Sequence, residues 1–171
     1  MGKLNREALA HYLDTSWNKK VTDVSKATFQ IIGKDIEEMT VEMSSDVTQT
    51  KNILGQSATV DNGYTPSMDA DPYYADPEEG IYQHLRDIAF ERLKGHDCKT
   101  LMLEVIVEDT EADKHLAYVR EVMVKPTSYG GGTDGFNIPF NVTEDGAWLK
   151  GTVTAASVKA GSPVFTEGSA L

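Results

Sequence analysis

A glycine-rich segment, residues 129–135, is the first place where this sequence invites a chemical interpretation, because phosphate-binding loops are also rich in glycine. A P-loop needs Gly-Lys-Ser/Thr leading into a helix, so that backbone amides and the lysine hold the phosphates. Here Thr133-Asp134-Gly135 leads into a strand-like segment, and the Asp134 carboxylate would repel a phosphate. The segment is therefore interpreted as a flexible connection.

A second candidate is an acidic run with the composition of a calcium loop, formed by Asp69, Asp71, Asp76, Glu78 and Glu79. An EF-hand loop that starts at Asp69 needs glycine at its sixth position and glutamate at its twelfth. The chain has Tyr74 and Gly80 at those positions. The run is better interpreted as the solvated acidic approach to a helix.

The remaining reactive side chains are dispersed. The four histidines show no metal-ligand spacing; they are His11, His84, His96 and His115. Cys98 precedes an apolar run, where a buried thiol is expected, and no Gly-x-Ser-x-Gly elbow is present. We therefore expect no catalytic residue, no metal site and no cofactor, and a protein that is not an enzyme.

Composition and charge narrow the class of protein further. The 171 residues suit one domain, 1–171, and carry 16 basic against 27 acidic side chains, a net charge of −11. Tight binding to nucleic acid needs clustered Lys and Arg, so neither nucleic acid nor an anionic membrane is expected as a partner. A single cysteine excludes an internal disulfide and fits synthesis in a reducing cytoplasm. The sequence contains no signal peptide and no apolar run of membrane-spanning length.

The elements that must position any functional residue are mostly strands. Residues 27–43 alternate with period two around Gly33-Lys34-Asp35, which predicts a β-hairpin. The run at 101–107 predicts a strand with one continuous apolar face, and the run at 116–124, apolar in part on both faces, predicts an inner strand. Residues 137–143 and 148–155 predict two more strands around a turn at Glu144-Asp145-Gly146. One helix is predicted from a cap at Asp76 to a stop at Gly95, because Ile81, Leu85, Ile88, Ala89 and Leu93 follow helical spacing.

Three segments do not fit a compact core. Residues 1–26 have weak helical spacing and are interpreted as an N-terminal arm that is ordered on a partner surface. Residues 44–63 are polar but contain recurring apolar side chains, which indicates either a mobile loop or a ribbon that is ordered against another molecule. Residues 156–171 are rich in Ser, Gly and Ala and are expected to be a flexible C-terminal tail.

In amino-acid sequence, five segments of the chain resemble the major tail proteins (tail tube proteins) of tailed bacteriophages and prophages of Gram-positive bacteria. These segments are Ile36–Glu42, Ser44–Gly55, Asp71–Pro77, Val124–Gly131 and Phe136–Val142. The resemblance implies a mainly β (α+β) fold, a β-sandwich or barrel of antiparallel strands flanked by one α-helix. It also implies a structural subunit of the virion tail, made in the host bacterial cytoplasm.

The same resemblance implies the partners. Copies of the chain would form hexameric rings stacked into a tube, which would contact tape measure, tail terminator and distal tail proteins. DNA would pass through the channel without specific binding during ejection into the host. The assembly residues implied are Trp17 in the arm and Val47, Ile53 and Leu54 in the loop.

Two alternative functions remain open from the sequence. One is the tube subunit of a contractile tail, a phage-like bacteriocin or a secretion system, which would share the same plan. The other is a monomeric β-sandwich that binds carbohydrate or protein, which predicts an exposed aromatic platform. The aromatic candidates for that platform are Tyr73, Tyr74, Tyr129 and Trp148.

Overall fold

The structure is a computed structural model that describes residues 2–168. Its strands are β1 (Leu9–Asp14), β2 (Phe29–Ile32), β3 (Val41–Glu42), β4 (Val47–Lys51), β5 (Ser57–Asp61), β6 (Ser67–Ala70), β7 (Lys99–Ile106), β8 (Lys114–Pro126), β9 (Phe140–Thr154) and β10 (Phe165–Glu167). Its helices are α1 (Gly80–Glu91) and α2 (Ala155–Lys159), with 3-10 turns η1 (Arg6–Ala8), η2 (Val21–Lys26) and η3 (Gly95–Cys98). No described helix is long and apolar enough to cross a membrane.

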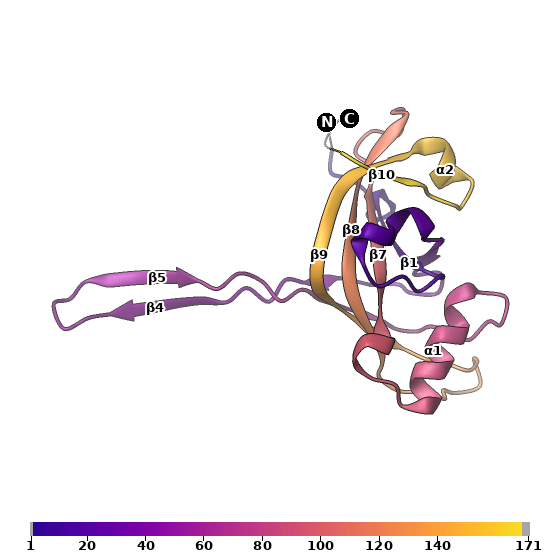
Figure 1. The fold of residues 1–171 in the computed structure, drawn as a ribbon, viewed down its shortest axis with the longest axis horizontal. Helices are drawn as coiled ribbons and strands as arrows, with labels where there is room; N and C mark the ends of the chain where they lie inside the picture. Colours follow the sequence, from indigo (N-terminus) through magenta and orange to yellow (C-terminus); the bar gives the residue numbers. More distant parts are fainter. Residues whose placement is uncertain (1, 169–171) are drawn as a thin grey trace.

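One antiparallel sheet organises the fold (Figure 1). Its strand order is β2-β1-β7-β8-β9-β6-β3, and β10 pairs with the second half of β9. The two predicted strands are confirmed as β7 and β8, which pair in continuous register from Lys99↔Met123 to Ile106↔Leu116. β8 lies inside the sheet as expected, and so does β7. β7 is buried on both faces over most of its length, whereas in β8 buried residues alternate with half-buried ones. The buried residues of β8 belong to one core before the bulge and to the other core after it.

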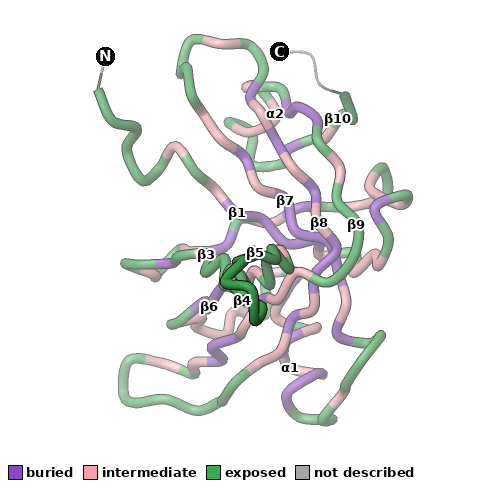
Figure 2. Tube along the Cα trace, turned by 90° about the vertical axis from the view of Figure 1, so that its left-hand side faces the viewer, coloured by how far each residue is buried: buried purple, intermediate pink, exposed green. Residues whose placement is uncertain are grey.

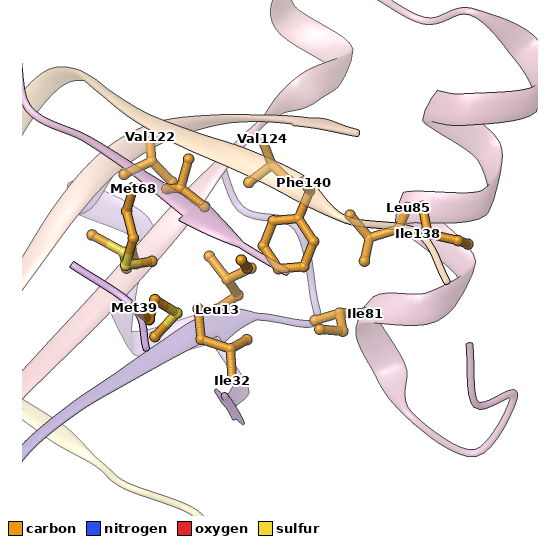
Figure 3. Close-up of a cluster of buried hydrophobic side chains, with 13 residues drawn as sticks. Leu13, Ile32, Met39, Met68, Ile81, Leu85, Val122, Val124, Ile138 and Phe140 are labelled. Carbon is orange, nitrogen blue, oxygen red and sulfur yellow. The ribbon is translucent and has the colours of Figure 1, made fainter. Parts of the chain in front are cut away.

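The sheet is curled, and each face contributes to a separate core. The inner face, closed by α1, holds a cluster in which α1 packs onto Phe140 and its neighbours (Figure 3). The outer face is covered by η2, α2 and β10, and its cluster is built on Leu101, Leu103, Val105, Ala117 and Val119. The mostly β fold with a curled antiparallel sheet and one main helix confirms the predicted fold class.

Helix α1 is confirmed, although both of its predicted ends are wrong. Ile81, Leu85, Ile88 and Ala89 are buried as expected. The Asp76 carboxylate accepts a hydrogen bond from the Glu78 backbone N–H at 3.0 Å, so it organises the turn before the helix rather than capping it. At the other end the chain leaves the helix at Arg92, which adopts a left-handed φ of 54°, three residues before Gly95.

The N-terminal segment is not an arm. Strand β1 lies inside the sheet between β2 and β7, and Tyr12 and Leu13 are buried on its two faces. The buried Asp14 carboxylate ends the strand, since it accepts hydrogen bonds from the backbone N–H groups of residues 16, 18 and 28.

The hairpin predicted for residues 27–43 is also wrong. β2 pairs with β1, whereas β3 pairs with β6 at the far edge of the sheet. Phe29 and Ile32 are buried in the two different cores, and Ile31, expected on the buried face, is 55% exposed. Local alternation was a correct sign of strands but carried no information about their partners.

Two further differences lie in the C-terminal third. The turn predicted at residues 144–146 is a bulge within the continuous strand β9, where the register with β8 shifts between Arg120 and Val122. Gly146, at φ 137°, packs against the Glu121 side chain, which leaves no room for a Cβ atom. The predicted flexible tail forms α2 and β10 up to Glu167, while residues 169–171 lie outside the described part of the chain.

Candidate assembly surface

A two-stranded ribbon projects far from the body of the protein (Figure 1). It consists of β4 and β5, which pair with each other and, among the described residues, with no other strand. The register runs from Val47↔Asp61 to Lys51↔Ser57. The loop predicted at 44–63 is therefore a ribbon, and all ten of its strand residues are exposed (Figure 2).

Backbone hydrogen bonds fix the base of the ribbon. The Asp46 N–H donates to the Gly63 carbonyl at 3.0 Å, and the Asn62 N–H donates to the Asp46 carbonyl at 2.7 Å. Below this point the Thr65 N–H donates to the Met43 carbonyl at 3.1 Å. These bonds pair the two arms of the ribbon with each other down to β3 and β6, which are themselves paired in the sheet.

The tip of the ribbon is organised by Asn52. Its side-chain oxygen accepts hydrogen bonds from the backbone N–H groups of Leu54 at 2.9 Å and Gln56 at 3.1 Å. Its side-chain amide donates to the Gln56 side-chain oxygen at 2.8 Å, and Gly55 supplies the left-handed φ of 79° that the turn requires. As a result Ile53 and Leu54 point into solvent, 101% and 77% exposed.

The ribbon exposes apolar area that no other part of the described residues 2–168 covers. Val47 and Val60 are 54% and 48% exposed, on opposite faces of the ribbon by their register. An isolated two-stranded hairpin is at best marginally stable in water. A partner that buries these side chains would stabilise the ribbon by mass action. The predicted residues Val47, Ile53 and Leu54 thus lie on one projecting element, with the last two adjacent at its tip.

Trp17 lies elsewhere, against α1. Its ring stacks on the His84 ring with centroids 4.3 Å apart and an interplanar angle of 8°. Its indole N–H donates to the Asp97 carbonyl at 3.1 Å. The structure therefore gives Trp17 an intramolecular role that joins the β1–η2 connection to the helix, and its assembly role stays a prediction.

A charged cluster that the sequence analysis missed lies on the inner face of the sheet, beyond the apolar core. The Arg120 guanidinium contacts the Glu104 carboxylate at 2.5 Å and the Glu144 carboxylate at 3.4 Å. The His11 Nε2 atom lies 3.1 Å from the other Glu104 oxygen, and the buried His11 Nδ1 has no hydrogen-bond partner within the described part of the chain. The four side chains come from β1, β7, β8 and β9, which are far apart in the sequence. A short sequence motif therefore could not predict the cluster.

Burial and hydrogen bonding act in opposite directions on the two glutamates. Burial alone would raise the pKa of Glu104, but hydrogen bonds from His11 and Arg120 outweigh it and hold the pKa below its ordinary value. Burial raises the pKa of Glu144, which is only partly compensated by the Arg120 charge. Arg120 also lies over the rings of Tyr118 at 5.3 Å and Trp148 at 5.6 Å, which pack against each other. The charged cluster of His11, Glu104, Arg120 and Glu144 therefore links four neighbouring strands in the middle of the sheet.

The described residues 2–168 contain no group of three or more His, Cys, Asp or Glu side chains arranged to hold a metal ion. No protein-family model matches the chain, and no curated protein matches it. A solved structure does match: the sheath/tube terminator, in its extended state, of PVC, an extracellular contractile injection system. The TM-score is 0.52 at 8% sequence identity, with 88% of this chain and 97% of that chain covered. This likeness shows a shared fold.

Proposed function

We propose that this protein is a structural subunit of a phage-type tail tube, in which hexameric rings stack around a channel that passes DNA into the host. The observation that carries this proposal is the ribbon, an ordered projection whose apolar residues face solvent. A monomer gains little from such an element, whereas a repeating assembly buries it once for every copy. Tape measure, tail terminator and distal tail proteins are the further partners, and the virion tail is the location.

The charge of the chain supports a conduit. A net charge of −11 repels the DNA backbone at any surface where the acids gather, so DNA passing through the channel would not be retained. The role is structural, without catalysis and without a cofactor.

The matching solved structure favours a second candidate, a tail terminator. That protein is the terminator of a sheath and tube. A protein that terminates a tube would not be extended by further copies of itself, whereas a tube subunit would stack. Tubes of contractile tails, phage-like bacteriocins and secretion systems share the stacking behaviour, and we rank them with the tail tube.

A monomeric binding module has one observation in its favour. Tyr118 and Trp148 pack together on an open part of the sheet, with ring centroids 6.0 Å apart and Trp148 55% exposed. The Arg120 guanidinium, however, lies over both rings and is fixed by two carboxylates. The pair is therefore already occupied by a side chain of its own protein, so a sugar ring has less aromatic surface to stack on.

Sedimentation velocity over a range of concentrations tests the proposal. The wild-type chain is expected to form species that lengthen with concentration, whereas a terminator would stop at one ring. A ribbonless variant, in which an Asn-Gly turn replaces residues 47–61, is expected to fold but to remain monomeric. Asp46 and Asn62 stay in place to close the shortened hairpin. Assembly of the ribbonless variant at wild-type concentrations would overturn the proposed role of the ribbon.

A further inference from the structure

A second exposed apolar surface lies at the end of α1, where three aromatic rings from two segments meet. Phe90 contacts Tyr129 with ring centroids 4.4 Å apart and Phe136 with centroids 6.3 Å apart. The three side chains are 49%, 42% and 39% exposed. We call Phe90, Tyr129 and Phe136 the aromatic cluster; neither the core nor the ribbon of the same chain covers it.

Fixed contacts hold the aromatic cluster in place. The Arg92 side chain donates a hydrogen bond to the Tyr129 hydroxyl at 3.1 Å and lies 5.5 Å from the centre of its ring. A second hydrogen bond from Arg92 to the Ala89 carbonyl secures the guanidinium on the last turn of the helix. The glycine-rich connection interpreted from the sequence as flexible is thus pinned at Tyr129. A rigid, exposed aromatic surface of this kind is typical of an interface.

The aromatic cluster and the ribbon lie on opposite sides of the molecule. In Figure 1 the ribbon projects to the left of the sheet, and α1 lies to its right. A contact between two different surfaces on opposite sides is heterologous, and repetition of such a contact builds rings or open helical assemblies. A contact of the ribbon with the same side of a second copy would instead close a two-fold dimer.

The charges of the ribbon tip and of the border of the aromatic cluster support a second copy of this chain as the occupant. Residues 47–60 of the ribbon contain a single charged side chain, Lys51, within a chain of net charge −11. The aromatic cluster is bordered in sequence by two exposed acids, Glu91 next to Phe90 and Asp134 two residues before Phe136. The exposed Arg92 at the same border is already engaged by the hydroxyl and ring of Tyr129, so Glu91 and Asp134 are the border charges available to Lys51 at the ribbon tip.

We infer that the ribbon tip of one copy, Ile53 and Leu54, docks on the aromatic cluster of the next copy, with Lys51 facing Glu91 and Asp134. This inference rests on the proposed function and assigns the receiving surface for the ribbon. The contact buries the two most exposed apolar side chains of the ribbon tip against three exposed rings. It also gives the assembly a direction, since each copy presents one ribbon and one receiving surface.

Cysteine cross-linking between two variant chains tests the contact. Chains carrying Leu54→Cys are mixed with chains carrying Phe90→Cys and oxidised, and the matched control pairs Leu54→Cys with Tyr64→Cys, a residue 59% exposed near the root of the ribbon. The native Cys98 is buried and does not compete. Leu54–Phe90 mixtures are expected to form the disulfide-linked dimer at least about tenfold faster than the control mixture, as direct contact at an interface implies.

The outcomes separate the inference from the proposed function. If wild-type chains assemble but the Leu54–Phe90 mixture cross-links no faster than the control, the receiving surface lies elsewhere and the tube proposal stands. If wild-type chains stay monomeric and no mixture cross-links, both are overturned. As a second measurement, Phe90→Ala is expected to raise the concentration needed for assembly about tenfold, and Tyr64→Ala less than about twofold. Equal effects of the two substitutions would overturn the inference.

Discussion

Replacing Arg120 with methionine is expected to destabilise the folded subunit by about 2–3 kcal/mol at neutral pH. Methionine keeps an aliphatic stem between Tyr118 and Trp148 but removes the charge that faces Glu104 and Glu144. Breaking a fully buried ion pair costs about 3–5 kcal/mol, and breaking a surface pair costs about 0–1 kcal/mol. Glu104, Glu144 and Arg120 are 13%, 19% and 25% exposed, so the expected loss lies nearer the buried limit.

The pH dependence follows from the same contacts. The lowered pKa of Glu104 contributes stability that is present above its ordinary value of 4.5 and is lost as the pH falls through the lower folded value. The raised pKa of Glu144 has the opposite sign, because its folded form gains relative stability as the pH falls through the raised value. Without Arg120, Glu144 loses its compensating charge and Glu104 keeps only His11 as a partner, so protonation of the two carboxylates on acidification relieves the variant more than the wild type. The difference between wild type and variant should therefore shrink on acidification.

Urea denaturation at pH 7 and at pH 4 measures this difference, with Lys99→Met as the matched control. Lys99 pairs with Asp145 at 3.0 Å, but the two side chains are 33% and 50% exposed. The control is expected to lose less than about 1 kcal/mol at either pH. A loss for Arg120→Met no larger than that for Lys99→Met, or a loss that does not change with pH, would refute the role assigned to the charged cluster.

Three further predictions concern the core, the C-terminal strand and the ribbon. Phe140→Ala removes a ring that is 1% exposed and is expected to cost about 3–5 kcal/mol in urea denaturation; a loss below about 1 kcal/mol would show that the core is not built on this ring. Gly151→Val places a side chain against the backbone at Thr166, so β10 should leave the sheet. Residues 160–168 should then become protease-sensitive while the helical circular-dichroism signal persists, and unchanged proteolysis would contradict this packing. Replacing the ribbon at 47–61 with Asn-Gly should change the free energy of unfolding by less than about 1 kcal/mol, since its strand residues are exposed; a larger loss would show that the ribbon supports the fold.

Local patterns in the sequence predicted individual elements well. Helix α1 and the inner strands β7 and β8 follow from apolar spacing alone, because burial on one or two faces fixes that spacing. Which strands pair was not predictable in the same way. β1 was missed because its polar His11 and Asp14 are buried: His11 Nε2 lies against Glu104 on β7, and Asp14 accepts hydrogen bonds from backbone N–H groups as far along the chain as Thr28. Non-local hydrogen bonds leave no periodic pattern in a sequence.

The same contrast between local patterns and non-local contacts holds for the candidate assembly surface. The apolar residues of the ribbon stood out because Val47, Ile53 and Leu54 interrupt a polar segment. The aromatic cluster could not be recognised in the sequence, since Phe90 and Tyr129 are 39 residues apart. They meet only because the end of α1 packs beside the loop after β8. The charged cluster has one weak sign in the sequence: Tyr118 and Arg120 alternate on the inner strand β8 with the apolar residues of its other face.

Electron microscopy of end-on views of the assembled wild-type protein tests the central claim most directly. Hollow rings with six-fold symmetry, and tubes built from them in side views, are the result predicted for a subunit that docks its ribbon on the next copy. Single particles of monomer size at every concentration, or closed two-fold dimers, would contradict it. Rings that never stack would support self-assembly into rings, but they would favour the tail terminator over the tube subunit as the function of the protein.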